Sequence, residues 1–163
     1  MSYESYEPPR GGAPDDGVSV NAVRLWSGGA ATAGVAALVA VIGVLIARDI
    51  LGFDLYGPAL LLSVSGSIGT DYVITAAALA LAGTGLAHAL AVTTPRPQAF
   101  FSWIVGLLTL AAVVVPFARD AVLASQISVA IINLVIGLSI GSLLSTVLSR
   151  TVFDSDGSWQ YRR

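Results

Sequence analysis

Four long apolar runs, separated by short polar stretches, dominate the pattern of this chain. They cover residues 25–47, 72–92, 99–118 and 127–149, and none of them contains an Asp, Glu, Lys or Arg. Each run has 20 to 23 residues. As an α-helix, such a run is about 30–35 Å long, which matches the hydrocarbon core of a bilayer. The pattern therefore predicts four membrane-spanning helices.

Two other interpretations of the apolar runs fit less well. The strands of a transmembrane β-barrel alternate apolar and polar residues, whereas these runs are continuous and rich in Ala, Leu and Gly. The first run is too long for a signal peptide and follows an acidic segment, so we expect a span that is retained. The expected fold is all-α, an integral membrane four-helix bundle over residues 22–152.

Arginine positions predict the orientation of the bundle, because positively charged short loops stay in the cytoplasm. Two arginines, Arg48 and Arg119, fall on one side of the predicted spans. Six fall on the other side: Arg10, Arg24, Arg96, Arg150, Arg162 and Arg163. We therefore expect both termini and the 93–98 loop inside. Residues 1–21 are predicted to be a disordered cytoplasmic tail, since Pro, Gly and acidic residues predominate, and residues 153–163 a second cytoplasmic tail.

The connections between the runs also carry signals. In the outer segment 48–71, residues 60–64 are apolar enough for a short interfacial helix, and Thr70 or Asp71 is a predicted N-cap of the second span. In the inner loop TTPRPQ, Thr94 is the predicted cap and Pro95 the predicted first helical residue of the third span. Such a short loop predicts that the second and third spans are antiparallel neighbours.

Composition excludes several kinds of chemistry. The 163 residues fit one domain, 55% of them are hydrophobic and 11% charged, and there is no cysteine, hence no disulfide, zinc thiolate or iron–sulfur cluster. A net charge of −2 without a basic run gives no reason to expect nucleic-acid binding. Motifs of zinc proteases, serine hydrolases and nucleotide-binding loops are also missing from the sequence. We expect neither enzyme activity nor a metal or cofactor.

Small and polar residues recur every four positions in the fourth span, so they share one helix face. They are Asn133, Gly137, Gly141, Ser145 and Ser149. Glycines spaced as in Gly137–Gly141 let another helix approach closely, either within this chain, which we expect, or in a second copy. An amide at Asn133 needs a partner in hydrocarbon. We expect an interhelical hydrogen bond, with a ligand or ion contact as the alternative.

The second span carries the only His, Asp, Glu, Lys or Arg side chain within the four runs, His88, on a face shared with Thr84. An imidazole titrates near neutral pH and is suited to a proton relay or a pH switch. No run contains a carboxylate with which His88 would exchange protons. We therefore expect a structural histidine that is hydrogen-bonded to Ser102 or to another polar group at the same depth.

Several segments together resemble a known family. They are RLW at residues 24–26, the TTPRP loop followed by FFSWIVGLLT, and INLVIGLSIGSLL in the fourth span. The chain is similar over residues 22–152 to an uncharacterised family of small four-span membrane proteins found mostly in actinobacteria. The resemblance implies a multi-pass protein of the plasma membrane. It implies no activity, ligand or functional residue.

These observations favour a non-enzymatic membrane protein that works through helix–helix contacts, as an accessory, assembly or scaffolding subunit. Its expected partners are the lipid bilayer and either another membrane protein or further copies of this chain. The alternative is a small oligomeric transporter or channel for an apolar or weakly polar solute. Its pore would be lined by Thr84, His88, Ser102, Asn133 and the serines of the fourth span.

Overall fold

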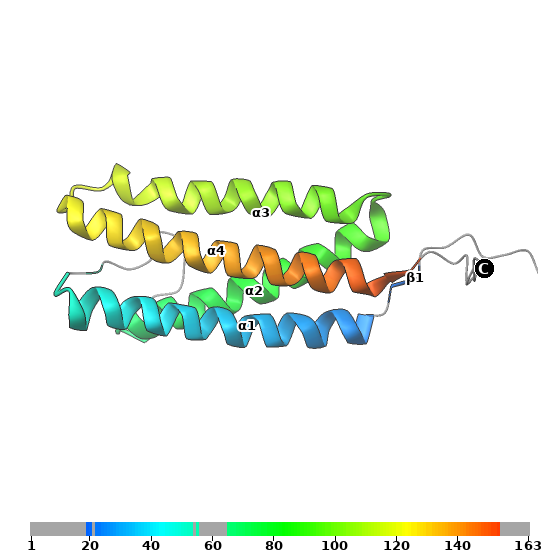
Figure 1. Cartoon of the computed structure of the whole chain (residues 1–163), viewed down its shortest axis with the longest axis horizontal. Helices are drawn as coiled ribbons and strands as arrows, with labels where there is room; N and C mark the ends of the chain where they lie inside the picture. The colour runs from blue at the N-terminus through cyan, green and yellow to red at the C-terminus, as the bar shows by residue number, and fades with distance from the viewer. Residues whose placement is uncertain (1–18, 21, 54, 56–64, 154–163) are drawn as a thin grey trace, which may run out of the picture.

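Four long helices lie side by side in an elongated bundle (Figure 1). The computed structural model describes residues 19–20, 22–53, 55 and 65–153. The helices are α1 (Ala22–Leu45), α2 (Ile68–Thr93), α3 (Pro97–Val114) and α4 (Leu123–Thr151). A π-helical turn, η1 (Ile46–Ile50), extends α1, and a 3-10 turn, η2 (Val115–Ala118), extends α3.

The helices confirm the predicted fold class. Within the described part of the chain, four helical segments are long and apolar enough to cross a membrane. Each contains one of the predicted spans and extends a few residues beyond it. The extra turns are expected physically, because the helical hydrogen-bond ladder continues into the polar interface, where water satisfies the free backbone groups at the ends.

Small side chains allow close packing of the helices. α1 packs along both α2 and α4, whereas α3 packs mainly on α4. The buried apolar residues of α1 and α2 are mostly alanines, and α4 supplies most of the larger aliphatic ones: Val129, Ile132, Ile136, Ile140, Leu144 and Leu148. α3 is the least buried of the four spans and buries only Phe101. Its outer surface presents Trp103, Leu107 and Leu110, which suits contact with lipid.

The chain enters and leaves the helix bundle at the same end of the bundle. Strand β1 (Ser19–Val20) pairs antiparallel with strand β2 (Val152–Phe153) beside the start of α1 and the end of α4 (Figure 1). The sequence assigned Ser19–Val20 to a disordered tail. For these two residues the prediction is wrong, because their backbone pairs with β2. The remainder of the predicted tails lies outside the described residues.

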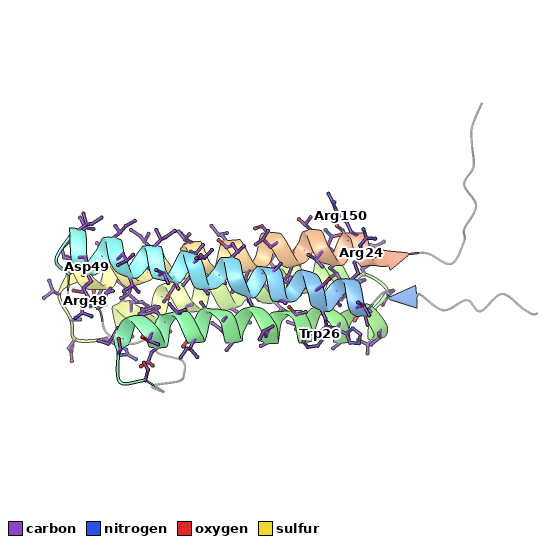
Figure 2. All side chains as sticks on the ribbon, turned by 90° about the horizontal axis from the view of Figure 1, so that it is seen from below. Arg24, Trp26, Arg48, Asp49 and Arg150 are labelled. Carbon is purple, nitrogen blue, oxygen red and sulfur yellow. The ribbon has the colours of Figure 1, made fainter. Side chains whose placement is uncertain are left out.

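Charged and aromatic residues mark the two ends of the bundle. Arg24, Trp26 and Arg150 lie at the end where β1 and β2 pair, and Arg48 and Asp49 lie at the opposite end (Figure 2). Trp26 is about half exposed, as expected for an aromatic ring at a membrane–water interface. The charged residues thus bracket an apolar band.

Two predicted helix starts are wrong by a few residues. The N-cap of α2 is Ser67, not Thr70 or Asp71. Asp71 lies in the first turns, where its Oδ1 accepts from the backbone N–H and the hydroxyl of Ser65, each at 3.0 Å. It therefore secures the incoming chain against the positive end of the helix rather than capping it.

The N-cap of α3 is Arg96, and Pro97 rather than Pro95 begins the helix. The chain has two prolines at this loop, and the second one occupies the first helical position, where the missing N–H is not needed. The interfacial helix predicted for residues 60–64 lies outside the described residues.

Candidate functional site

Thr84 marks a close approach of α1 and α2. Its side chain is fully buried, and its hydroxyl donates to the carbonyl oxygen of Ala80, one turn earlier, at 2.8 Å. On the other side it lies against Gly29: a Cβ built on Gly29 would be 2.8 Å from the Cβ of Thr84, which is closer than real Cβ contacts. The absence of a side chain at Gly29 is therefore required for the two helices to approach this closely.

The glycine pair of α4 packs in the same way against α3. A Cβ on Gly137 would be 2.9 Å from the Cβ of Thr109, and one on Gly141 would be 3.2 Å from Cγ1 of Val105. The hydroxyl of Thr109 donates to the carbonyl oxygen of Val105 at 2.8 Å, so it is satisfied within α3. Within this chain, the GxxxG of α4 is thus a contact surface for α3.

Asn133 links α4 to the end of α3. Its Nδ2 donates to the carbonyl oxygen of Ala112 at 2.8 Å. In a continuous α-helix this oxygen would accept the N–H of residue 116, but residue 116 is proline, which has no N–H. Asn133 therefore supplies the donor that Pro116 removes, and two polar groups that would be costly to leave unpaired in hydrocarbon satisfy each other.

Ser102 and Ser145 form a weaker polar contact near the other end of the same helix pair. Their hydroxyl oxygens are 3.5 Å apart, at the limit of a hydrogen bond. The contact pairs α3 with α4, so the structure brings Ser102 to Ser145 and not to His88.

His88 is half-buried on α2, and its Nδ1 is buried. Among the described residues, this nitrogen has no hydrogen-bond partner, and neither has the hydroxyl of Thr75 four turns earlier on the same helix. The sequence predicted a hydrogen-bonded His88, and at Nδ1 the structure does not have this hydrogen bond. In the described part of the chain, no three His, Asp or Glu side chains lie close enough together to hold a metal ion.

The predicted site residues fall into separate groups rather than one centre. Thr84 belongs to the contact of α2 with α1, and His88 lies farther along α2. The others lie along the contact of α3 with α4: Ser102, Asn133, Gly137, Gly141 and Ser145. The two groups are on different helix pairs, so the structure does not gather them around a common cavity.

Sequence reasoning missed the groups that receive these residues. The sequence did not identify Gly29 as the partner of Thr84. The carbonyl oxygen of Ala112 is a backbone atom, which no side-chain motif indicates. Pro116 was the available signal, because a proline late in a helix leaves the carbonyl four residues earlier without its donor. Gln126 was also missed: its amide donates to the carbonyl oxygen of Arg119 at 2.8 Å and closes the turn between α3 and α4.

The fold and its contacts define a class of protein: a multi-pass membrane protein built as a compact four-helix bundle with small residues at its helix contacts. Within that class, the chain belongs to DUF6069, a family of unknown function, whose model matches residues 20–150. The match covers α1, α2, α3 and all but the last residue of α4. Comparison with curated proteins and with solved structures found no match.

Proposed function

We propose that this protein is a non-enzymatic accessory, assembly or scaffolding subunit, which binds another membrane protein through its helix faces. The proposal rests on one observation, the hydrogen-bond partners of the polar side chains inside the bundle. The hydroxyls of Thr32, Thr84 and Thr109 donate to carbonyls of their own helices, and Asn133 donates to α3. These groups are engaged in helix structure and packing, where they contribute to assembly rather than to chemistry.

A partner helix has suitable surfaces on the outside of the bundle. Gly34 on α1, Gly85 on α2 and Gly106 on α3 each face open space, since a Cβ there would meet nothing within 4 Å. These three glycines have no packing role inside the described part of the chain. Glycine also lowers the helix propensity of the segment that contains it. At these positions a backbone from another protein can approach closely, as small residues allow in membranes.

The second candidate is a small oligomeric transporter or channel. Nδ1 of His88 supports this candidate, because a buried nitrogen without a hydrogen-bond partner among the described residues marks a polar position at membrane depth that the packing does not use. The division of the other polar residues between two helix pairs counts against a pore within one chain. A pore would then need several copies, with His88 facing their common axis.

We further propose that the bundle lies in the plasma membrane with both termini in the cytoplasm. The end that carries β1 and β2 has Arg24, Arg96 and Arg150 among its described residues, and the opposite end has Arg48 and Arg119 together with Asp49, Asp71 and Asp120. An excess of arginine around short loops favours the cytoplasmic side.

The proposed function is tested by co-purification from the native membrane with exposed and buried glycines replaced. Gly34→Leu and Gly106→Leu place a bulky side chain on the outer surface, where the bundle itself offers no obstacle. We expect at least one of them to release a co-purifying membrane protein while insertion and thermal stability remain unchanged. Gly137→Leu is the matched control, because it disrupts the contact with Thr109 inside the chain and lowers stability first.

Two results would refute the proposal. One is a partner that is retained by every outer-surface variant and lost only when the bundle unfolds. The other is solute flux through liposomes that contain the purified protein alone and that His88→Ala abolishes, which would establish the transporter instead.

A further inference from the structure

Two arginines lie side by side at the end of the bundle where β1 and β2 pair. The helices α1 and α4 approach closely there, since a Cβ built on Gly28 would be 3.3 Å from the Cβ of Val147. Arg24 precedes Gly28 by about one turn, and Arg150 follows Val147 by about one turn on the neighbouring helix. Both side chains are exposed, and Figure 2 shows them beside the paired strands. The seam of α1 and α4 therefore ends in a pair of positive charges.

Within the described part of the chain, this end of the bundle has no negative charge to balance the arginine pair. The described carboxylates are those of Asp49, Asp71 and Asp120, which lie toward the opposite end. Arg150 has no hydrogen-bond or ion-pair partner among the described residues. Two like charges on neighbouring helix ends repel each other, so two carboxylates placed beside them would stabilise this end of the seam. The arginine pair is thus suited to an acidic peptide segment.

The N-terminal segment, residues 1–18, has the matching charge. It lies outside the described residues and contains four Asp or Glu side chains and one arginine. Residues 154–163, which follow β2, contain two Asp side chains and two arginines and have no such excess. Asp15 and Asp16 are adjacent in the sequence, as the two arginines are in space. Charge complementarity therefore favours the N-terminal segment as the occupant.

The N-terminal segment is also within reach of the arginine pair. The strand register, Ser19 with Phe153 and Val20 with Val152, fixes the start of β1 close to the residues that follow Arg150. Asp16 precedes Ser19 by three residues, so the two are at most about 11 Å apart. So short a tether gives the carboxylates an effective concentration at the arginines of about millimolar or more.

We propose that Arg24 and Arg150 form a docking site for the N-terminal segment of this chain, and that Asp15 and Asp16 are the groups bound. The docked segment continues the link that β1 and β2 make between the first turn of α1 and the last turn of α4. It also covers the arginine pair, so any other anion that binds these arginines has to displace it. The segment is a removable cover on this end of the bundle.

The proposal is tested by electron paramagnetic resonance of the full chain in a neutral detergent, with a nitroxide on Ala13→Cys. The label is unique, because the chain has no cysteine. We expect an immobilised label at low salt, and Arg150→Gln should lower the ratio of immobile to mobile label by about threefold, the effect of one exposed ion pair. Salt at about 1 M should also release the label, since it screens charges beyond about 3 Å.

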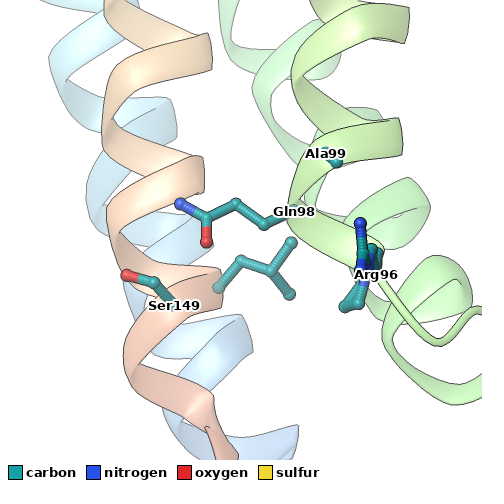
Figure 3. A pocket seen from close by; sticks show the side chains of 6 residues that line it. Arg96, Gln98, Ala99 and Ser149 are labelled. Atoms are coloured by element: carbon teal, nitrogen blue, oxygen red, sulfur yellow. The ribbon is translucent and has the colours of Figure 1, made fainter.

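Two matched controls separate this contact from a general effect of charge. Arg96→Gln removes an exposed arginine at the same end, but Arg96 lies at the start of α3 and points away from α4 (Figure 3). Asp154→Asn with Asp156→Asn removes two carboxylates that follow β2. Both controls should leave the label immobilised. Asp15→Asn with Asp16→Asn should release it at least as much as Arg150→Gln.

Three results would overturn the proposal. The first is a label that is already mobile at low salt in the chain with all its arginines. The second is release by either control to the same extent as by Arg150→Gln. The third is an effect of Arg150→Gln that occurs only when phosphatidylglycerol is present, because the lipid would then be the group bound to the arginines.

Discussion

Replacement of Asn133 by alanine separates a structural role of this amide from a role in ligand binding. The change removes the 2.8 Å hydrogen bond from Nδ2 to the carbonyl oxygen of Ala112. Interhelical hydrogen bonds in membranes contribute about 0.6 kcal/mol on average and up to about 1.7. Here the acceptor has also lost its helical donor to Pro116, so we expect a loss of about 1–2 kcal/mol, in the upper part of that range.

The second mutation of a double-mutant cycle tests this reason. Pro116→Ala restores the N–H that the carbonyl oxygen of Ala112 accepts in a regular α-helix. In that background, Asn133→Ala should cost less than about 0.5 kcal/mol, which gives a coupling energy of about 1 kcal/mol. Any loss of packing from the smaller side chain is the same in both backgrounds and cancels in the cycle.

The measurement is reversible unfolding by sodium dodecyl sulfate in mixed micelles, followed by intrinsic tryptophan fluorescence. Ser139→Ala is the control, since Ser139 donates only to the carbonyl oxygen of Val135 on its own helix and should change stability by less than about 0.5 kcal/mol. If Asn133→Ala destabilises the protein equally with and without Pro116, the missing helical donor is not the reason, and the reasoning fails. A large loss of transport or binding at unchanged stability would favour a ligand role for Asn133.

Three further predictions follow from the contacts and from the arginine distribution. Gly137→Ala forces a Cβ against Thr109 and should destabilise the bundle by about 1–3 kcal/mol, with Thr109→Ala restoring at least half of the loss in the same unfolding assay; no rescue would place the strain elsewhere. Asp71→Ala should raise hydrogen exchange in the first turns of α2 and leave the other helices unchanged, whereas exchange that rises throughout the bundle would show a global role for this carboxylate. Because the chain has no cysteine, single replacements report topology: Asp120→Cys should react with an impermeant maleimide on intact cells and Thr94→Cys only after lysis, and the reverse pattern would invert the proposed orientation.

Hydropathy was sufficient to predict the four spans, because a bilayer leaves few structures open to a continuous apolar run. The ends of the helices were harder to predict, since they depend on local choices such as which proline of the 93–98 loop takes the first helical position. Asp71 is an example. A carboxylate near a helix start was expected, but its partner, Ser65, lies in the preceding loop and gives no periodic signal.

The candidate site shows a similar limit. The four-residue spacing placed Gly137 and Asn133 on one face of a helix, but periodicity within one helix cannot identify the helix that receives that face. Gly137 contacts Thr109, whereas Asn133 contacts a backbone carbonyl that became available only through Pro116. The same reasoning linked His88 with Ser102 on the basis of similar depth, and depth alone did not determine which helices are neighbours.

The proposed role is binding to another membrane protein. Its most direct test is the mass of the complex that is extracted from native membranes. Extraction in a mild detergent followed by native mass spectrometry should give a complex whose mass is not a whole multiple of the 16.7 kDa chain and which releases a second, different chain on activation. A defined oligomer whose mass is a whole multiple of 16.7 kDa, and which conducts solute when placed in liposomes, would contradict the proposed role.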